Sequence, residues 1–316
     1  NITDVGHLVS DGDEGEDKME LGSKKSGMDA WELAKFFTDA FQADLSKLNI
    51  LPPDIWCRAT DHIAEQIDFV KELEAKGFTY RLTDGIYFDS KKLENYGHLA
   101  RLDIGGLQEG ARVEKGERRF LTDFALWKFS PEGETRQMEW ESPWGKGFPG
   151  WHIECSAMSA KFLGDYFDIH CGGEDHIPVH HTNEIAQTEA ARGTRLANFW
   201  MHGYFLRLKE DKMSKSSGSF ITLQTILDYG FEPLVYRYFL LGSHYRTQIT
   251  FSWEGLEAAK TSLTRLYELA FEWGDPGEVH RPTLKAIQKD LNDDLAMPKA
   301  LATLWQMVKS DLAPSE

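Results

Sequence analysis

Residues 166–208 constrain the fold more than any other stretch of this sequence. The segment "YFDIHCGGEDH" predicts a short strand that ends in glycines, and "HHTNEIAQTEAARG" predicts the helix that follows it. The next segment, "FWMHGYFLRL", is apolar enough for a second buried strand. Strand, helix and strand in this order are typical of a βαβ unit with a parallel sheet. The sequence therefore predicts an α/β fold.

The segments on either side of this unit predict further elements. The polar, glycine-rich stretch from Val9 to Gly27 predicts a long loop, and Ser26 and Asp29 have the spacing of a capping box before a helix. A second helix is expected to end at Gly77, and Asp84-Gly85 predicts a hairpin, so this part reads as a small α+β insertion. Residues from about 222 onward are predicted to be largely helical. The apolar stripes that indicate these helices contain Leu33, Phe37, Phe41 and Leu45, then Ile63, Ile67 and Val70, and finally Leu256, Ala259, Leu263 and Leu266.

The composition limits the classes of protein to which this chain can belong. Its 316 residues are 41% hydrophobic and 27% charged, which is ordinary for a globular protein and favours two domains. Acidic residues outnumber basic ones, 51 to 35, and the net charge of −16 argues against indiscriminate adhesion to nucleic acids or membranes. No apolar run approaches the roughly 18 residues that a membrane span needs. The three cysteines are too few for a disulfide framework, which favours a soluble protein of the reducing cytosol.

Cys155, His180 and Glu184 are a candidate metal-binding set. His180 and Glu184 are four residues apart at the head of a predicted helix, so both side chains lie on one face of that helix. A thiolate, an imidazole and a carboxylate together are a plausible ligand set for zinc. The spacing also allows a plainer interpretation, in which Cys155 is a small buried residue and the other two form a surface pair.

Two further segments are candidate nucleotide contacts. At the end of the first predicted strand, Gly172 and Gly173 would let the backbone approach a nucleotide, and Asp175 could accept hydrogen bonds from a ribose. The loop "LKEDKMSKSSGSF" places Lys212 and Lys215 among small residues that would let it close over phosphates. A simple turn and a solvated loop are the alternatives for these two segments.

In combination these segments are far more specific than each is alone. The "KMSKS" of residues 212–216 resembles the second signature of class I aminoacyl-tRNA synthetases. "PGWHIECSAMS", "FDIHCGGEDHIPVHHTNEIAQTEA" and the opening "NITDV" resemble the cysteinyl-tRNA synthetase family in particular. The resemblance runs from Asn1 to the final predicted helix. It implies a Rossmann-like catalytic domain with a parallel sheet, incomplete at its N-terminus, with an α+β insertion and a helical domain after it.

The resemblance implies roles for individual residues. Cys155, His180 and Glu184 match three of the family's four zinc ligands, and Thr3 and Trp151 match positions that line the cysteine substrate. Lys212 and Lys215 match the catalytic loop over the phosphates of ATP, whose Mg²⁺ complex is the expected cofactor. The segment that packs around the adenosine is matched by His170, Gly172, Gly173 and Asp175.

The same resemblance implies the domain limits. Residues 1–220 match the catalytic domain, with an insertion at about 28–122, and residues 221–316 match the stem-contact region and the start of a helical bundle. We expect the family's "HIGH" segment, its fourth zinc ligand and its anticodon-binding region to be missing from this chain. Cys171, His176 and Thr182 depart from the residues that are common in the family, which we interpret as subfamily variation.

The implied activity is that of a cysteine–tRNA ligase. Cysteine is activated by ATP to cysteinyl-adenylate and transferred to tRNA(Cys), while zinc selects the substrate thiolate. A cytoplasmic monomer that does not bind membranes is expected. Two alternatives remain open: a cysteine ligase of the mycothiol pathway, which transfers cysteine to an amino-sugar, and a non-catalytic paralogue or inactive fragment that binds cysteine or RNA.

Overall fold

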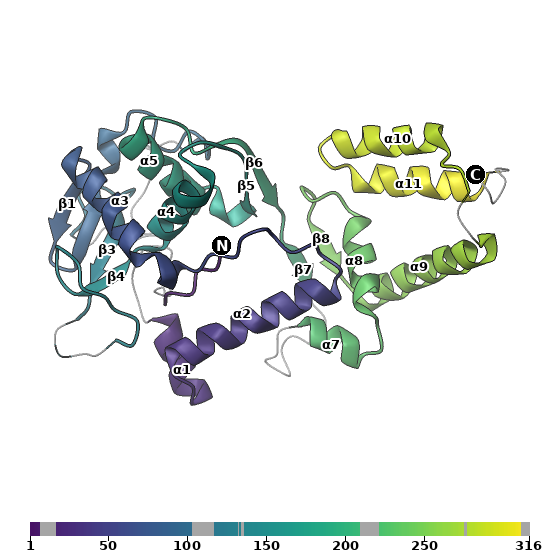
Figure 1. The fold of residues 1–316 in the computed structure, drawn as a ribbon, viewed down its shortest axis with the longest axis horizontal. Coiled ribbons are helices and arrows are strands. Elements are labelled where there is room, and N and C mark those ends of the chain that lie inside the picture. The colour runs from purple at the N-terminus through teal and green to yellow at the C-terminus, as the bar shows by residue number, and fades with distance from the viewer. Residues whose placement is uncertain are drawn as a thin grey trace. The chain divides into compact units, whose positions relative to one another are not determined.

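The computed structural model describes residues 1–6, 17–102, 117–131, 133, 136–208, 221–274 and 277–310. The chain divides into two compact units (Figure 1). The first unit contains Asn1–Gln42 and Pro53–Met201, and the second contains Ala43–Pro52 and His202–Glu316. The domain limits expected from the sequence, with a boundary after residue 220 and an insertion at about 28–122, stay a prediction.

An antiparallel four-stranded sheet forms one layer of the first unit. Its strand order is β1 (Thr79–Leu82), β2 (Gly85–Phe88), β3 (Phe124–Phe129) and β4 (Gly147–Pro149). The predicted hairpin is confirmed, since β1 and β2 pair on either side of Thr83 and Asp84. The predicted helix before it is also confirmed: α3 (Ile63–Ala75) ends just before Gly77, whose φ of +78° favours glycine. The core between sheet and helices includes Val70, Phe88, Leu126 and Trp127.

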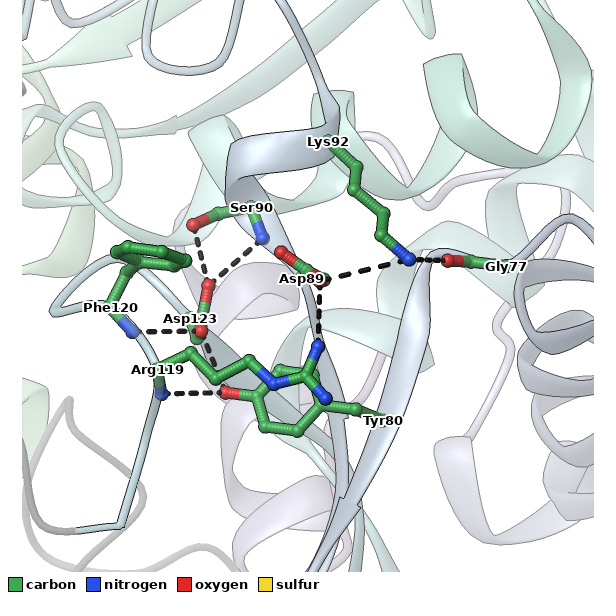
Figure 2. Close-up of polar contacts among 8 residues, drawn as sticks. All are labelled: Gly77, Tyr80, Asp89, Ser90, Lys92, Arg119, Phe120 and Asp123. Atoms are coloured by element: carbon green, nitrogen blue, oxygen red, sulfur yellow. Dashed lines mark hydrogen bonds and ion pairs between the residues drawn. The ribbon is translucent and has the colours of Figure 1, made fainter.

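A buried polar network fixes one end of this sheet (Figure 2). The Asp123 carboxylate is 1% exposed and accepts hydrogen bonds from the Tyr80 hydroxyl at 2.7 Å and the Phe120 amide at 3.0 Å. It also accepts from the amide of Ser90 at 2.9 Å and from its hydroxyl at 2.6 Å, at the start of the short helix η2 (Ser90–Lys92). One carboxylate therefore joins three separate segments of the chain.

The Val9–Gly27 segment is not a loop throughout. Residues 7–16 lie outside the described part, but α1 (Lys18–Ser26) occupies most of the rest. Asp17 accepts hydrogen bonds from the amides of Met19 at 2.6 Å and Glu20 at 3.1 Å, which satisfies donors at the helix start. This capping of the first turn stabilises a helix in spite of the polar, glycine-rich composition from which a loop was expected.

The expected capping box before the next helix, α2 (Ala30–Lys47), is shifted by three residues. The reciprocal bonds join Asp29 and Glu32, because the Glu32 amide donates to Asp29 at 2.8 Å and the Asp29 amide donates to Glu32 at 3.1 Å. Of the predicted apolar stripe, Leu33 is buried, whereas Phe37 and Phe41 are exposed.

The predicted order of strand, helix and strand is confirmed. β5 (Phe167–Gly173) and β6 (Ala197–Gly203) lie in one two-stranded sheet, and α5 (His180–Arg192) lies between them in the chain. The helix α4 (Trp151–Leu163) precedes β5 and packs against α5. The two strands are less buried than expected: Ile169 is 52% and Phe199 62% exposed. Within the described residues this sheet has only two strands, so much of its surface stays open.

The second unit is largely helical, as predicted. Its helices are α7 (Leu223–Asp228), α8 (Pro233–Leu241), α9 (Trp253–Trp273), α10 (Arg281–Asn292) and α11 (Met297–Val308). A small parallel sheet of β7 (Leu206–Leu208) and β8 (Ile249–Phe251) accompanies them, and Leu256 lies in the core beside it. Among the helices that the model describes, none is both long enough and apolar enough to cross a membrane.

Candidate metal centre

The structure brings the three predicted metal ligands together. Cys155 comes from the second turn of α4, and His180 and Glu184 come from the first two turns of α5. One ligand atom from each residue lies within 4.8 Å of the other two, and all three residues are buried. The packing of α4 against α5 therefore brings the thiol to the face on which the four-residue spacing places the other two.

Glu184 is the most enclosed of the three. Its side chain is fully buried, and its Oε1 atom lies 3.0 Å from Nε2 of His180. Nε2 of His170, from β5, lies 3.1 Å from Oε2. Burial by itself would raise the pKa of Glu184, but the neighbouring imidazoles of His180 and His170 outweigh it and hold the pKa far below the usual range. Glu184 is therefore an ionised carboxylate shielded from bulk solvent, which suits a metal ligand.

The Cys155 thiol, unlike the Glu184 carboxyl group, favours its protonated form. Burial, followed by the negative charges of Glu184 and Glu154, raises its pKa well above the ordinary value. The side-chain amide of Asn1 donates a hydrogen bond to its sulfur at 2.9 Å. Without a metal the sulfur is a protonated thiol at neutral pH, and a bound cation would be needed to hold it as thiolate.

His152 orients the His180 imidazole. It precedes Cys155 by three residues on α4, is 1% exposed, and its Nδ1 atom lies 2.9 Å from Nδ1 of His180. The nitrogen of His180 that faces Glu184 is Nε2. When Nε2 gives its lone pair to a metal, Nδ1 carries the proton and can donate it to His152. His152 thus favours the tautomer that a metal ligand requires.

Replacing His152 with phenylalanine is expected to weaken zinc binding by about 10–100-fold, since the ring is retained but the partner of His180 Nδ1 is lost. Competition with a chromophoric chelator measures this affinity. His62→Phe is the control, because His62 is also buried, at 8% exposed, but packs on Phe162 instead. Equal affinities for the two variants would show that His152 does not orient the ligand.

Aromatic rings surround the three ligands. The Trp151 ring lies 4.2 Å from the ring of His180, centroid to centroid, and 5.7 Å from the ring of His176. The Trp200 ring, from β6, contacts His170 and His181 at 4.9 and 5.0 Å. Trp151 was expected to line the amino-acid substrate, and it lies next to His180 of the candidate metal-binding set.

The other predicted site residues lie at various distances from this centre. A Cβ on Gly172 would meet Cε1 of His181 at 2.5 Å, so only glycine fits beside that ring. A Cβ on Gly173 would come within 2.3 Å of Asp175, which is on the exposed side of the short helix η4 (Glu174–His176). Thr3 is exposed, on the opening segment whose Asn1 contacts Cys155. Lys212 and Lys215 lie outside the described residues.

Three residues at the centre were not predicted as site residues: Asn1, His152 and His181. Helical spacing could have indicated two of them, because His152 precedes Cys155 by three residues and His181 precedes Glu184 by three. The contact of His170 with Glu184 depends on how β5 lies beside α5 and has no signal in local spacing, and its expected position near an adenosine stays a prediction.

Comparisons with known proteins identify the family of this chain. Residues 4–261 match the family model described as tRNA synthetases class I (C) catalytic domain. The whole chain is 60% identical to "Cysteine--tRNA ligase 1" of Burkholderia lata and covers 67% of it. It is 43% identical over its whole length to "Cysteine--tRNA ligase" of Treponema denticola and covers 70% of that protein.

A solved structure supports the fold. Mycobacterium tuberculosis methionyl-tRNA synthetase, bound by methionyl-adenylate, superposes with a TM-score of 0.65 at 18% identity, over 97% of this chain and 73% of that one. At this identity the likeness concerns the fold alone. The family match covers most of the chain, so the expected Rossmann-like class I fold is confirmed. This chain belongs to the family of class I tRNA synthetase catalytic domains of the cysteine type.

Proposed function

We propose that this chain carries the catalytic domain of a cysteine–tRNA ligase. Its substrates are L-cysteine, ATP with Mg²⁺, and tRNA(Cys); cysteinyl-adenylate is the intermediate. The observation that carries the proposal is the buried convergence of Cys155, His180 and Glu184 beside Trp151, in a chain 60% identical to a protein of that name. A monomer acting in the cytoplasm completes the proposal.

The donor set fits zinc. Cys155 offers a soft sulfur and His180 and Glu184 offer borderline nitrogen and oxygen atoms, a combination that favours zinc over magnesium or calcium. These three ligands leave room for the family's fourth protein ligand, and a zinc site can expand to five-coordinate when a substrate atom binds. Bound there, zinc would take the cysteine sulfur as thiolate and leave serine's hydroxyl, which does not ionise near neutral pH, outside.

The residues of the chain prepare this site. When Nε2 of His180 acts as a ligand, its Nδ1 proton can be donated to Nδ1 of His152, which lies 2.9 Å away. The low pKa of Glu184 keeps its carboxylate ionised throughout the physiological range. The indole of Trp151 lies against His180 and limits the room beside it, which favours a small side chain. A pocket of this kind separates cysteine from serine by chemistry, because shape alone yields only about 1–3 kcal/mol.

Pyrophosphate exchange tests the proposal. Cysteine, but not serine, is expected to drive exchange of labelled pyrophosphate into ATP, measured on this chain and on a version completed with the flanking segments of the Burkholderia lata relative. Transfer of the label to tRNA(Cys), and not to a glucosaminyl-inositol acceptor, identifies the second step. Absence of exchange in both versions would favour a non-catalytic binding protein, and transfer to the amino-sugar would favour the mycothiol-pathway ligase.

Lys215→Ala in the active version is expected to slow adenylation about 100-fold or more while cysteine binds almost as well, because a positive charge over the phosphates acts mainly in the transition state. Single-turnover rates and equilibrium binding separate the two effects. Lys209→Ala, in the same loop but outside the "KMSKS" signature, is the control. Equal losses of rate and of cysteine affinity would contradict a transition-state role for Lys215.

A further inference from the structure

The Glu184 carboxylate has more imidazole neighbours than one zinc site uses. Oε1 lies 3.0 Å from Nε2 of His180, which belongs to the proposed zinc set. Nε2 of His170 lies 3.3 Å from Oε1 and 3.1 Å from Oε2, and Nε2 of His181 lies 3.9 Å from Oε1. Two ring nitrogens that the proposed zinc set does not use therefore point at the same carboxylate.

These two nitrogens and the carboxylate have the dimensions of a metal site. The ligand atoms of His170, His181 and Glu184 all lie within 4.8 Å of one another. Around a tetrahedral zinc ion with bonds of about 2.0–2.1 Å, ligand atoms are about 3.3 Å apart. The contact of His170 with Oε1, at 3.3 Å, already has this length, whereas Nε2 of His181, at 3.9 Å, would have to approach that oxygen by about 0.6 Å. Side-chain rotations that shorten this contact and bring the two imidazole nitrogens, which lie within 4.8 Å, closer together would complete the set.

The surroundings hold both rings in position. The rings of His170 and His181 lie 4.7 Å apart, and the Trp200 ring packs on both of them. Gly172 leaves room for the His181 ring, because a Cβ at that position would lie 2.7 Å from its Nε2 atom. His181 is 2% exposed, while the His170 side chain is 15% exposed and gives access to the group.

We propose that His170, His181 and Glu184 form a second divalent-metal site, adjacent to the proposed zinc set and sharing Glu184 with it. Its two imidazoles and one carboxylate suit Zn²⁺, Co²⁺ or Ni²⁺, and it contains no thiolate. A carboxylate with two oxygens can bridge two ions about 3.5–4 Å apart, as in two-metal enzymes. The second ion binds more weakly than the first, since it shares one negative charge and meets the repulsion of its neighbour. The inference uses the proposed function only for the identity of the first site.

A cobalt titration of the chelator-stripped chain tests this proposal. It is run in a Cys171→Ala background, because Cys171 is an exposed thiol on β5 that could bind cobalt by itself. The first equivalent is expected to produce a near-ultraviolet thiolate-to-cobalt band, and a second, weaker equivalent is expected to add visible d–d absorption without increasing that band. A single equivalent at saturation, accompanied by the thiolate band, would overturn the proposal.

Variants assign the two steps. His181→Gln is expected to remove the second equivalent and keep the thiolate band, and Cys155→Ala is expected to remove the band and keep a nitrogen-ligated ion. His98→Gln, at an exposed histidine outside the group, should bind like the parent chain. If His181→Gln still bound two equivalents, the second ion would be adventitious and the proposal wrong.

Folding of each variant is checked by circular dichroism. If the chain does not fold with glutamine at the enclosed His181, His170→Gln at the more accessible ring tests the same point, because it too is expected to remove the second equivalent. If Cys155→Ala lost both equivalents together with the thiolate band, this result would argue against the second site. If the parent chain never showed the band but bound one ion through His181, this result would contradict only the proposed zinc set.

Discussion

Replacing Cys155 with alanine is expected to reduce zinc from about one ion per chain to a trace after dialysis against a chelator, because the thiolate contributes most to zinc affinity among these three donors. Inductively coupled plasma mass spectrometry of the dialysed protein gives the ratio. Cys171→Ala is the matched control, since its thiol lies on β5 and is exposed, whereas Cys155 is buried. Zinc retained by Cys155→Ala at the parental level would exclude the proposed ligand set.

The pH dependence of zinc binding follows from the same thiol. The pKa of Cys155 is raised in the metal-free chain, first by burial and then by the nearby carboxylates, so the thiol is protonated at neutral pH and must lose its proton to bind zinc. Protons therefore compete with zinc, and apparent affinity is expected to rise about tenfold per pH unit between about pH 7 and 8. Calorimetry in buffers of different ionisation enthalpy counts the released proton. A pH-independent affinity would mean that the sulfur is not a ligand.

Asp123→Asn is expected to lower the free energy of unfolding by about 2–4 kcal/mol, the cost of two buried hydrogen bonds to a charged acceptor. Both carboxylate oxygens of Asp123 accept two bonds each: Oδ1 from the amide and hydroxyl of Ser90, and Oδ2 from the Tyr80 hydroxyl and the Phe120 amide. Asparagine replaces one of these two oxygens with an NH₂ group. That group would face hydrogen-bond donors, and a backbone amide such as that of Phe120 cannot accept a hydrogen bond from it.

Urea unfolding of the first unit, followed by tryptophan fluorescence, measures this loss. Asp68→Asn is the control: Asp68 is an exposed residue of α3 whose side chain pairs with Lys71, and such pairs contribute less than about 1 kcal/mol. Tyr80→Phe removes one of the four bonds and is expected to have an intermediate effect. If Asp123→Asn unfolded at the same urea concentration as Asp68→Asn, the network would not stabilise the sheet.

Local patterns predicted the elements better than they predicted the contacts between them. The spacing of His180 and Glu184, together with donor chemistry, indicated the metal set that α4 and α5 bring together, although spacing alone left a plain surface pair possible. The contacts of His170 with Glu184 and of His152 with His180 join residues 14 and 28 positions apart. They depend on how strand and helices pack, which periodicity does not specify.

The incorrect expectations have specific physical causes. Glycine and charge in the Val9–Gly27 segment suggested a loop, but the Asp17 cap at one end and Gly27, with its φ of +74°, at the other enclose the helix α1. The apolar run in β6 suggested a buried strand, yet Phe199 is exposed, because apolar composition indicates what a strand can bury and not what covers it. The "KMSKS" loop and the domain limits stay predictions.

Because Gly172 has no side chain, a mutation at this position can test the role of the histidine rings that lie beside it. Added there, a single methyl group would collide with two histidine rings at once, those of His181 and His176, without altering any donor atom. An alanine allele at this codon would therefore displace the rings while every ligand keeps its chemical identity. Such an allele separates what the cluster does by its shape from what it does by its composition, a distinction that replacing the histidines themselves cannot make.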